Sequence, residues 1–418
     1  MTNLQERASL LDNADALSHK IEEFSLPKDT IYLDGNSLGP LTKNAQLRAQ
    51  EVVQQQWGQS LIASWNSHDW ISLPSIVGNK IAQLVGASAN SVVCCDSISV
   101  NLFKILSAAV QLQKTEKRRL ILSQNDNFPT DLYMAQGLSQ LLGTNNCELL
   151  SVASNEIEST LEAKGNDISI MMLSHVNFKN GAIFDIPKLT QLAHSKGVLV
   201  VWDLAHSAGI LPLDLSAWNV DFAVGCTYKY LNGGPGAPAF IYAAPRLLAD
   251  LQQPLSGWMG HKSPFAFDHD YDKNTGIEQF LSGTPSIISM SVLDAALDVF
   301  NKVSMQAIRN KSLALNEFFQ TCIKELIPQS SLSLACSLDH QTRGSQISFK
   351  HEHAYAICQA LISHNVIADF RAPNILRLGF SPLFLSFKNA YDAATVLQDI
   401  IESKKFLHTE FQIKHKVT

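Results

Sequence analysis

The sequence lacks the features that mark membrane, secreted and nucleic-acid-binding proteins. No apolar run approaches the roughly 20 residues that cross a bilayer, since even VLVVWD at 198–203 ends on Asp203. The seven cysteines form an odd set without a CxxC pair, and the polar start MTNLQERASLLDNADALSHK has no apolar core of a secretory signal. The 32 basic residues are scattered and face 38 acidic ones, a formal charge of −6. We therefore expect a soluble, cytoplasmic protein that binds neither membrane nor nucleic acid.

Internal repeats, low-complexity tracts and linker-like charge runs are also absent. With 418 residues, of which 46% are hydrophobic, the chain has material for a large core and more than one domain. We expect one folded protein rather than a string of separate modules.

Short aliphatic runs alternate with amphipathic stretches between about residues 90 and 245, which indicates strands joined through helices. DIPKLTQLAHSKG at 185–197 has the signals of a complete helix, with Asp185 as cap, Pro187 in the first turn and Gly197 at the stop. Right-handed crossovers of this kind place strands in parallel, so we expect an α/β fold with a mostly parallel sheet and ligands at the strands' carboxyl ends. The expected strands are 118–123, 147–152, 168–176, 198–203, 221–227 and 237–243.

The pattern changes past about residue 290, where a long helical stretch at 291–326 precedes three short strand-like runs. Those runs, near 345–349, 366–371 and 375–380, would be covered by helices near 353–364 and 387–402. We expect residues 1–50 to form an N-terminal arm that belongs with the small domain, residues 51–295 a large α/β domain, and residues 296–418 a smaller C-terminal α+β domain.

Asp203 and Lys229 form the sharpest chemical signal. Each follows an expected strand, Asp203 in WDLAHSAG and Lys229 in GCTYKYLNGGPG, 26 residues apart. A pyridine ring that serves as an electron sink needs a carboxylate against its ring nitrogen, and its aldehyde needs an amine with a lowered pKa. The pair predicts a pyridoxal phosphate (PLP) enzyme with its cofactor held by Lys229 as a Schiff base.

Plainer interpretations exist for each residue alone. An Asp at a strand end often caps the next helix, and a Lys is usually a solvated surface group. His206, three residues after Asp203, is either a group beside the ring or an ordinary packed histidine. Asp203 and His206 could also bind a metal, but no third ligand at useful spacing accompanies them. The segment 97–110 looks like a helix start that could hold a phosphate, with Ser99 as donor, or simply a serine cap.

The chain resembles kynureninase, a PLP enzyme of fold type I that splits L-kynurenine into anthranilate and L-alanine in tryptophan breakdown and NAD supply. The motifs that carry the resemblance run through nearly the whole chain: IYLDGNSLGP at 31–40, SWNSHDW at 64–70, DSISVNL at 96–102, NFPTDLY at 127–133, LSHVNFKNG at 173–181, VWDLAHSAG, TYKYLNGGPG, GWMGH at 257–261, FLSGTPS at 280–286 and ILRLGFSPLF at 375–384.

The resemblance implies a cofactor role for individual positions. Lys229 would carry the cofactor and move protons, and Asp203 would pair with the pyridinium nitrogen. His206 would lie beside the ring and Phe128 on its face. Tyr228 would bind the phosphate and is a candidate proton donor. The other implied cofactor contacts are Ile98, Ser99, Pro129, Thr130, Asp131 and Ser174.

The resemblance also implies how substrate and partner subunit meet. Arg377 would bind the α-carboxylate, with a surface ion pair as its plain alternative. Trp65, Asn36 and Ser37 would wall the aryl pocket, although core packing and a simple turn explain them equally well. Trp258 and Thr284 would complete the phosphate site of the other protomer in a homodimer. Relatives that favour 3-hydroxykynurenine carry Asn at the position of Thr284, so unsubstituted kynurenine is expected as the preferred substrate.

Two other activities fit parts of the pattern. The Asp, His and Lys skeleton is shared with cysteine desulfurases and aminotransferases of the same fold, and Cys336 could then carry a persulfide or be an idle thiol. A PLP-binding regulator would show cofactor absorbance without turnover, but Lys229 and Arg377 are both present and no DNA-binding extension is seen.

Overall fold

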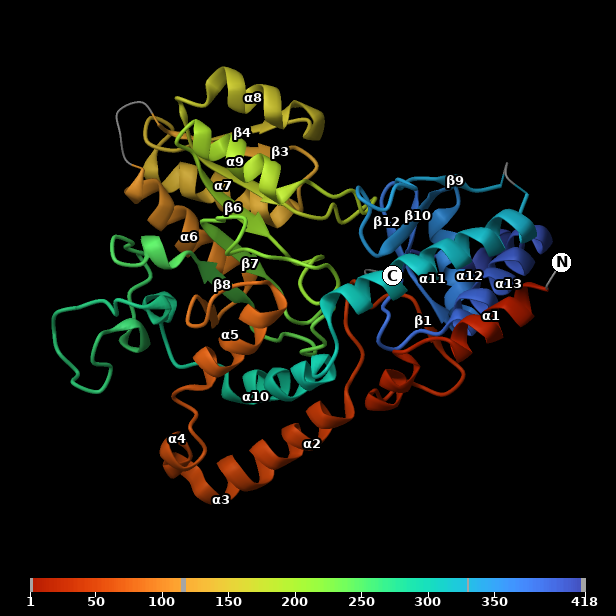
Figure 1. Cartoon of the computed structure of the whole chain (residues 1–418), viewed down its shortest axis with the longest axis horizontal. Helices are drawn as coiled ribbons and strands as arrows, with labels where there is room; N and C mark the ends of the chain where they lie inside the picture. The colour runs from red at the N-terminus through yellow and green to blue at the C-terminus, as the bar shows by residue number, and fades with distance from the viewer. Residues whose placement is uncertain (1–2, 114–117, 329–330, 415–418) are drawn as a thin grey trace.

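The computed structural model describes residues 3–113, 118–328 and 331–414 (Figure 1). Its centre is a seven-stranded sheet in the order β2-β8-β7-β6-β5-β3-β4, in which β8 runs against the other described strands. The strands are β2 Val92–Cys94, β3 Leu120–Gln124, β4 Glu148–Val152, β5 Ile168–Ser174, β6 Leu199–Asp203, β7 Phe222–Gly225 and β8 Phe240–Ala243. The mostly parallel sheet expected from the sequence is thus present.

Helices cover both faces of this sheet, because its central strands carry apolar side chains on both faces. In β5, Met171 and Leu173 pack into the core on one face, and Ile170 and Met172 pack into the core on the other. The first face is covered by α5 Leu73–Leu84, α8 Ile157–Lys164 and α9 Ile186–Ser195, and the second by α6 Ile98–Leu112 and α7 Pro129–Leu142.

The crossover helix α9 begins and ends where the sequence indicated. The Asp185 carboxylate accepts from the Lys188 N–H (2.9 Å), Pro187 lies in the first turn, and Gly197 adopts a φ of +70° just after the helix. α9 therefore delivers the chain directly into β6, the strand that ends on Asp203.

A smaller antiparallel sheet has the order β12-β13-β10-β9. Its strands are β9 Ser333–Leu334, β10 Gln346–Lys350, β12 Asp369–Arg371 and β13 Ile375–Gly379, and it is packed by α11 Met305–Leu326, α12 Ala354–Ser363 and α13 Phe387–Ser403 (Figure 1). The N-terminal segment joins this part of the molecule, since α1 Leu4–Asn13 packs on α13 and β1 Ile31–Tyr32 pairs with β11 Val366–Ile367 in parallel.

The single long helix expected over 291–326 is wrong in one respect. The chain forms α10 Ile287–Ala296, the short helix η8 Leu297–Phe300 and then α11, with a break between them. Lys302 adopts a φ of +62°, which a continuing right-handed helix does not allow, and the Ser304 hydroxyl accepts from the Ala307 N–H to start α11 afresh.

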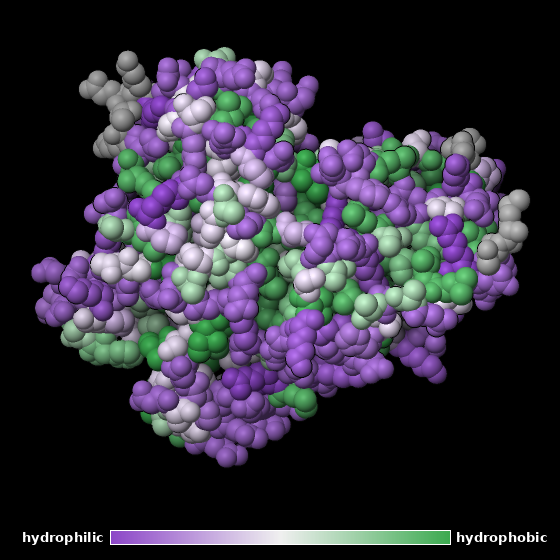
Figure 2. All heavy atoms as spheres, viewed as in Figure 1, coloured by the Kyte–Doolittle hydropathy of each residue, from purple (hydrophilic) through white to green (hydrophobic). Residues whose placement is uncertain are grey.

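The described chain also forms further, mostly short helical segments. They are α2 Lys43–Glu51, η2 Val52–Trp57, α3 Gly58–Ser60, α4 Ser64–Ser67 and the short turns η1 Ser18–Glu23, η3 Leu61–Ala63, η4 Ser154–Glu156, η5 Pro245–Leu247, η6 Trp258–Gly260, η7 Ile277–Phe280, η9 Lys405–Leu407 and η10 Thr409–Gln412. Figure 2 shows hydrophilic residues over most of the viewed face, with apolar residues in patches between them. Among the described residues, no helix combines the length and apolar character needed to cross a membrane.

Candidate active site

Asp203 and Lys229 lie where two neighbouring strands of the large sheet end. Asp203 is the last residue of β6, and its parallel neighbour β7 ends at Gly225, four residues before Lys229. The Ala205 N–H donates to Asp203 Oδ1 (2.8 Å) and fixes the carboxylate. Because carboxyl ends of parallel strands meet at one edge, two residues distant in sequence reach the same site.

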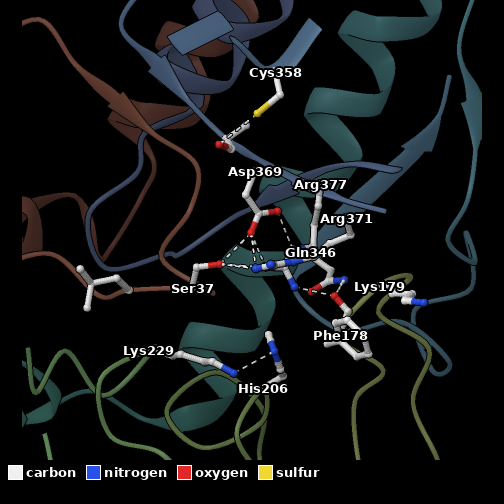
Figure 3. Close-up of polar contacts among 12 residues, drawn as sticks. Ser37, Phe178, Lys179, His206, Lys229, Gln346, Cys358, Asp369, Arg371 and Arg377 are labelled. Atoms are coloured by element: carbon white, nitrogen blue, oxygen red, sulfur yellow. Dashed lines mark hydrogen bonds and ion pairs between the residues drawn. The ribbon is translucent and has the colours of Figure 1, made fainter. Parts of the chain in front are cut away.

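A cavity of about 300 Å³ opens at this edge. In Figure 3 the side chains of Lys229 and His206 point toward one another, with Lys229 Nζ 3.1 Å from His206 Nε2. Pro129 starts α7 between two lining residues without lining the cavity itself. The residues of interest from the sequence that line it are Ile98, Ser99, Phe128, Thr130, Asp131, Ser174, Asp203, His206, Tyr228 and Lys229.

Asp131 and Asp203 are two buried carboxyl groups with different protonation. Burial raises the pKa of Asp203 above its ordinary value, and the charge of Lys229 and the Ala205 N–H reduce the size of that rise. Burial and then the negative charge of Asp203 raise the pKa of Asp131 well above its ordinary value. No donor among the described residues reaches Asp131 Oδ2, which suits an oxygen that carries the proton. Asp203 is therefore the anion of the pair.

His206 is held as a neutral ring. Burial lowers the pKa of His206 well below its ordinary value, and the positive charges of Lys229, Arg377 and Arg371 lower it further. Its Nε2 faces Lys229, and its buried Nδ1 has no hydrogen-bond partner among the described residues. Because the imidazole is neutral, His206 adds no second positive charge beside Lys229 that would compete for the Asp203 anion.

Aromatic rings surround the lysine. Lys229 Nζ lies 5.9 Å from the centre of the Phe128 ring and 5.8 Å from that of Tyr228. Phe178, which sequence reasoning did not single out, meets Phe128 edge to face at 5.3 Å and also lines the cavity. Burial raises the pKa of Tyr228, so its hydroxyl keeps its proton and remains a donor.

The N-terminus of α6 points to the same cavity. Ser97 is the capping residue and its hydroxyl accepts from the Val100 N–H at 3.4 Å, so the cap is Ser97 rather than Ser99. Ile98 and Ser99 occupy the first turn, where backbone N–H groups lack helical partners. This end of α6 suits an anionic group, as expected for a phosphate.

These observations test whether the residues fit the expected cofactor. A buried Asp203 anion calls for a cationic ring nitrogen, the unpartnered His206 Nδ1 calls for a polar neighbour, and the start of α6 suits a phosphate. Lys229 Nζ lies near the Phe128 ring, whose face could stack on a planar heterocycle. The donor set therefore fits PLP.

Arg377 lies at the centre of the small sheet and is 1% exposed. Its Nε donates to Asp369 Oδ1 (2.8 Å), and its Nη2 donates to Asp369 Oδ2 and to Ser37 Oγ (2.8 Å) (Figure 3). Nη1 donates to the carbonyl of Phe178. With its amide oxygen turned toward the guanidinium, Asn36 accepts from Nε at 2.9 Å. Arg377 is thus a buried member of a network and not a surface ion pair.

Comparison with known proteins identifies the family. The C-terminal domain model of kynureninase matches residues 308–397. The chain is 43% identical to the kynureninase of Pseudomonas fluorescens over 98% of both chains, and 44% identical to that of Burkholderia mallei (strain SAVP1) over 99% of both. This chain belongs to the kynureninase family.

Solved structures share the fold of this chain. A cysteine desulfurase from Thermococcus onnurineus NA1 superposes with a TM-score of 0.77 at 18% identity, covering 92% of this chain and 98% of that one. A C-DES variant with glycine covalently linked to its PLP cofactor gives 0.75 at 16% identity, covering 88% and 97%. The fold class expected from the sequence is confirmed.

Seven residues that the kynureninase resemblance places at the site do not line the cavity of the single chain. Pro129 is described above, and Asn36, Ser37 and Arg377 lie together at the small sheet. The other three are Trp65, Trp258 and Thr284. Trp65 packs edge to face on Trp70 at 6.0 Å, and Trp258 does so on Phe265 at 5.5 Å. Thr284 is exposed, outside the described helices and strands. Within one chain, Trp65, Trp258 and Thr284 are all outside the lining of the cavity.

Cys336 does not line the cavity either. It is partly buried, and burial raises the pKa of its thiol, which disfavours the thiolate that a persulfide carrier needs. The family assignment and the location of Cys336 outside the cavity both argue against the desulfurase alternative.

Three residues around Arg377 were missed by sequence reasoning. They are Asp34, Asp369 and Arg371. A signal did exist: Asp369 and Arg371 stand two apart in the run VIADFR, so a strand places both on one face among apolar neighbours. Phe178 carried no such signal, because its position depends on the contact between the two sheets.

Proposed function

We propose that this chain hydrolyses L-kynurenine between Cβ and Cγ, taking up one water and releasing anthranilate and L-alanine, with PLP attached to Lys229. The observation that carries the proposal is that Lys229 and the buried Asp203 anion line the same cavity of about 300 Å³. We infer the reaction from the sequence similarity to kynureninases, because the fold is shared with cysteine desulfurases and does not determine the reaction by itself.

When bound, PLP supplies an electron sink for negative charge that develops on the substrate. Asp203 would hold the ring nitrogen protonated, and Asp131, which keeps its own proton, would donate toward Asp203. Phe128 would stack on the ring, and the first turn of α6 with Tyr228 would hold the phosphate. His206 would stay neutral beside the ring.

Lys229 is the group that moves protons. Its Nζ lies next to His206 Nε2 at 3.1 Å, so the ammonium can be held while the substrate amine takes its place. As a free amine, Lys229 would remove the proton from the substrate Cα and return it later. Tyr228 retains its hydroxyl proton and is the candidate donor in the last protonation.

The substrate's α-carboxylate would be bound by Arg377. Asn36 and Ser37, which the resemblance assigns to the aryl pocket, hydrogen-bond Arg377, so we assign them to the carboxylate end instead. Trp65 would border the aryl group. The site would be completed in a homodimer, with Trp258 and Thr284 of one protomer serving the other. Neither residue lines the cavity of a single chain, which supports this. Thr284 also leads us to infer a preference for kynurenine over 3-hydroxykynurenine.

The proposal includes a cytoplasmic setting and a place in tryptophan breakdown. The seven cysteines are all free thiols, and six of them are buried, as a reducing compartment would leave them.

The test is anthranilate fluorescence from purified, PLP-loaded protein given L-kynurenine, with Lys229→Ala as the decisive variant. Wild type should release anthranilate, and Lys229→Ala should lose both turnover and the cofactor absorbance of the attached form. Lys188→Ala is the matched control, because Lys188 is an exposed lysine paired with Glu158 on the surface. It should behave as wild type.

Borohydride trapping followed by peptide mass spectrometry locates the attachment directly. An adduct on a peptide other than the one containing Lys229, or wild-type turnover by Lys229→Ala, would reject the assignment. Sulfide release from cysteine without anthranilate release from kynurenine would instead favour a desulfurase.

A further inference from the structure

A second guanidinium, that of Arg371, lies beside Arg377. Its Nη2 donates to Asp369 Oδ2 (2.7 Å) and to Ser37 Oγ (3.0 Å), the same two side chains that hold Arg377 (Figure 3). β12 and β13 pair Asp369 with Arg377 in register, which aligns all three side chains on one face. Arg371 is thus built into the same site and is not a stray surface cation.

Arg377 has few donors left for a substrate. Of the five N–H bonds of its guanidinium, Nε and Nη2 are directed at Asp369 and Ser37, and one on Nη1 is directed at the Phe178 carbonyl. One N–H on Nη1 remains. A carboxylate normally takes two parallel N–H bonds from arginine, so Arg377 alone provides half of that arrangement.

Arg371 has the missing donors. Both of its hydrogen bonds to described residues come from Nη2, and its buried Nε has no partner among them. Its side chain is 33% exposed, against 1% for Arg377, so a small ligand can reach it. An unpaired, buried guanidinium N–H is costly unless an acceptor arrives.

The charge of the cluster also calls for one anion. Burial of Asp369 opposes its ionisation, but the charge and hydrogen bonds of Arg377 outweigh it and lower its pKa to about 2. Burial and then Asp369 raise the pKa of Asp34 to about 8, so Asp34 is largely neutral at pH 7. Two arginines and one carboxylate leave one positive charge in excess. Arg377 Nη1 donates to the carbonyl of Phe178, and Phe178 lines the cavity, so the cluster lies next to the cavity.

We propose that Arg371 is a second carboxylate-binding residue, which shares the α-carboxylate of an amino acid substrate with the remaining Nη1 hydrogen of Arg377. Asp369 and Ser37 are the positioning residues that hold the two guanidinium groups side by side. This inference rests on the proposed function, because it assigns the substrate's carboxylate to this face of the small sheet.

The test compares Arg371→Gln and Arg371→Lys with Arg246→Gln. Arg246 is a matched control: its side chain is 41% exposed and pairs with a buried aspartate, Asp221, as Arg371 pairs with Asp369. Arg371→Gln should raise the KM for kynurenine by about 10- to 100-fold with kcat lowered much less. Arg371→Lys should lie between, because it keeps the charge and loses the planar fork. Arg246→Gln should match wild type.

A binding measurement separates this role from a structural one. L-Alanine and L-alaninamide, followed by the change in cofactor absorbance, differ only in the charge of the carboxyl end. Arg371→Gln should weaken binding of alanine about 10-fold or more and leave alaninamide nearly unchanged. Equal losses for both ligands, or a kynurenine KM within twofold of wild type, would overturn the inference. Absence of kynurenine cleavage by the wild type would reject the proposed function alone, since the alanine comparison still measures Arg371.

Discussion

Gly39 lies against the backbone of Lys229, so a single added methyl group there should displace the lysine. The Gly39 N–H donates to the Tyr228 carbonyl (2.7 Å). A Cβ at Gly39 would lie 2.3 Å from the Lys229 carbonyl oxygen and 2.7 Å from Asn232 Cα. Both are backbone atoms, which cannot rotate away as a flexible side chain would.

The size of the effect follows from that overlap. A Cβ closer than 3.0 Å forces a neighbour to move, so the Lys229 carbonyl must retreat by at least about 0.7 Å or the segment that contains Gly39 must lift by as much. Because a misplacement of about 1 Å at a reacting group can cost about 100-fold in rate, Gly39→Ala should lower kcat/KM for kynurenine by roughly 10-fold or more. Overpacking of this kind should also cost about 1–3 kcal/mol in the free energy of unfolding.

Anthranilate release and urea unfolding measure the two effects, with Gly137→Ala as control. Gly137 is exposed within α7, and a Cβ there would meet nothing within 4 Å. That substitution should leave kcat/KM unchanged and stabilise the protein by about 0.5–1 kcal/mol, the usual gain of alanine over glycine in a helix. If Gly39→Ala keeps kcat/KM within twofold of wild type at unchanged stability, the arm does not constrain Lys229 as argued.

Three further predictions address single groups. Because the folded-state pKa of Asp34 is raised to about 8, Asp34 should lower the free energy of unfolding progressively as pH rises from about 4 to about 8. Asp34→Asn should therefore stabilise the protein more at pH 9 than at pH 5, as measured by urea unfolding. Equal changes at both pH values would contradict this. Asp203→Asn should retain attached cofactor absorbance but lose about 100-fold or more in kcat, because an amide cannot hold the ring nitrogen protonated; near-normal turnover would remove Asp203 from the mechanism. Phe128→Leu should weaken PLP binding by roughly 2- to 10-fold in equilibrium titration through loss of ring stacking, whereas unchanged affinity would mean that the ring does not stack there.

The sequence predicted the large sheet well because its signals are local. Six strands were expected from aliphatic runs and all six exist as β3 to β8, whereas β2 was missed because Val92–Cys94 is too short to show a pattern. The break before α11 was also missed, since apolar spacing continues across it and only the positive φ of Lys302 and the Ser304 cap reveal it.

The same distinction between local and distant signals holds for the site. Asp203 and Lys229 could be predicted as neighbours because each follows a strand of one parallel sheet. Phe178 could not, because its carbonyl meets Arg377 only once the loop after β5 packs against the small sheet. The roles of Trp258 and Thr284 are beyond a single chain, because the resemblance assigns them to the site of a second one.

The segment from residue 33 to 39 explains why the carboxylate end and the lysine end of the site cannot vary independently. At one end the Leu33 carbonyl accepts from the Gly379 N–H, and Asn36 packs so closely on Gly379 that a Cβ there would lie 2.6 Å from Asn36 Cγ. At the other end Gly39 abuts the Lys229 carbonyl. Neither Gly39 nor Gly379 has room for a Cβ, so the segment is held tightly at both ends. It therefore constrains the spacing between the Arg377 and Lys229 backbones. In the proposed function, Arg377 and the Lys229 end of the site would bind the carboxylate and the amine of one amino acid, so the arm would help to match the site to that spacing.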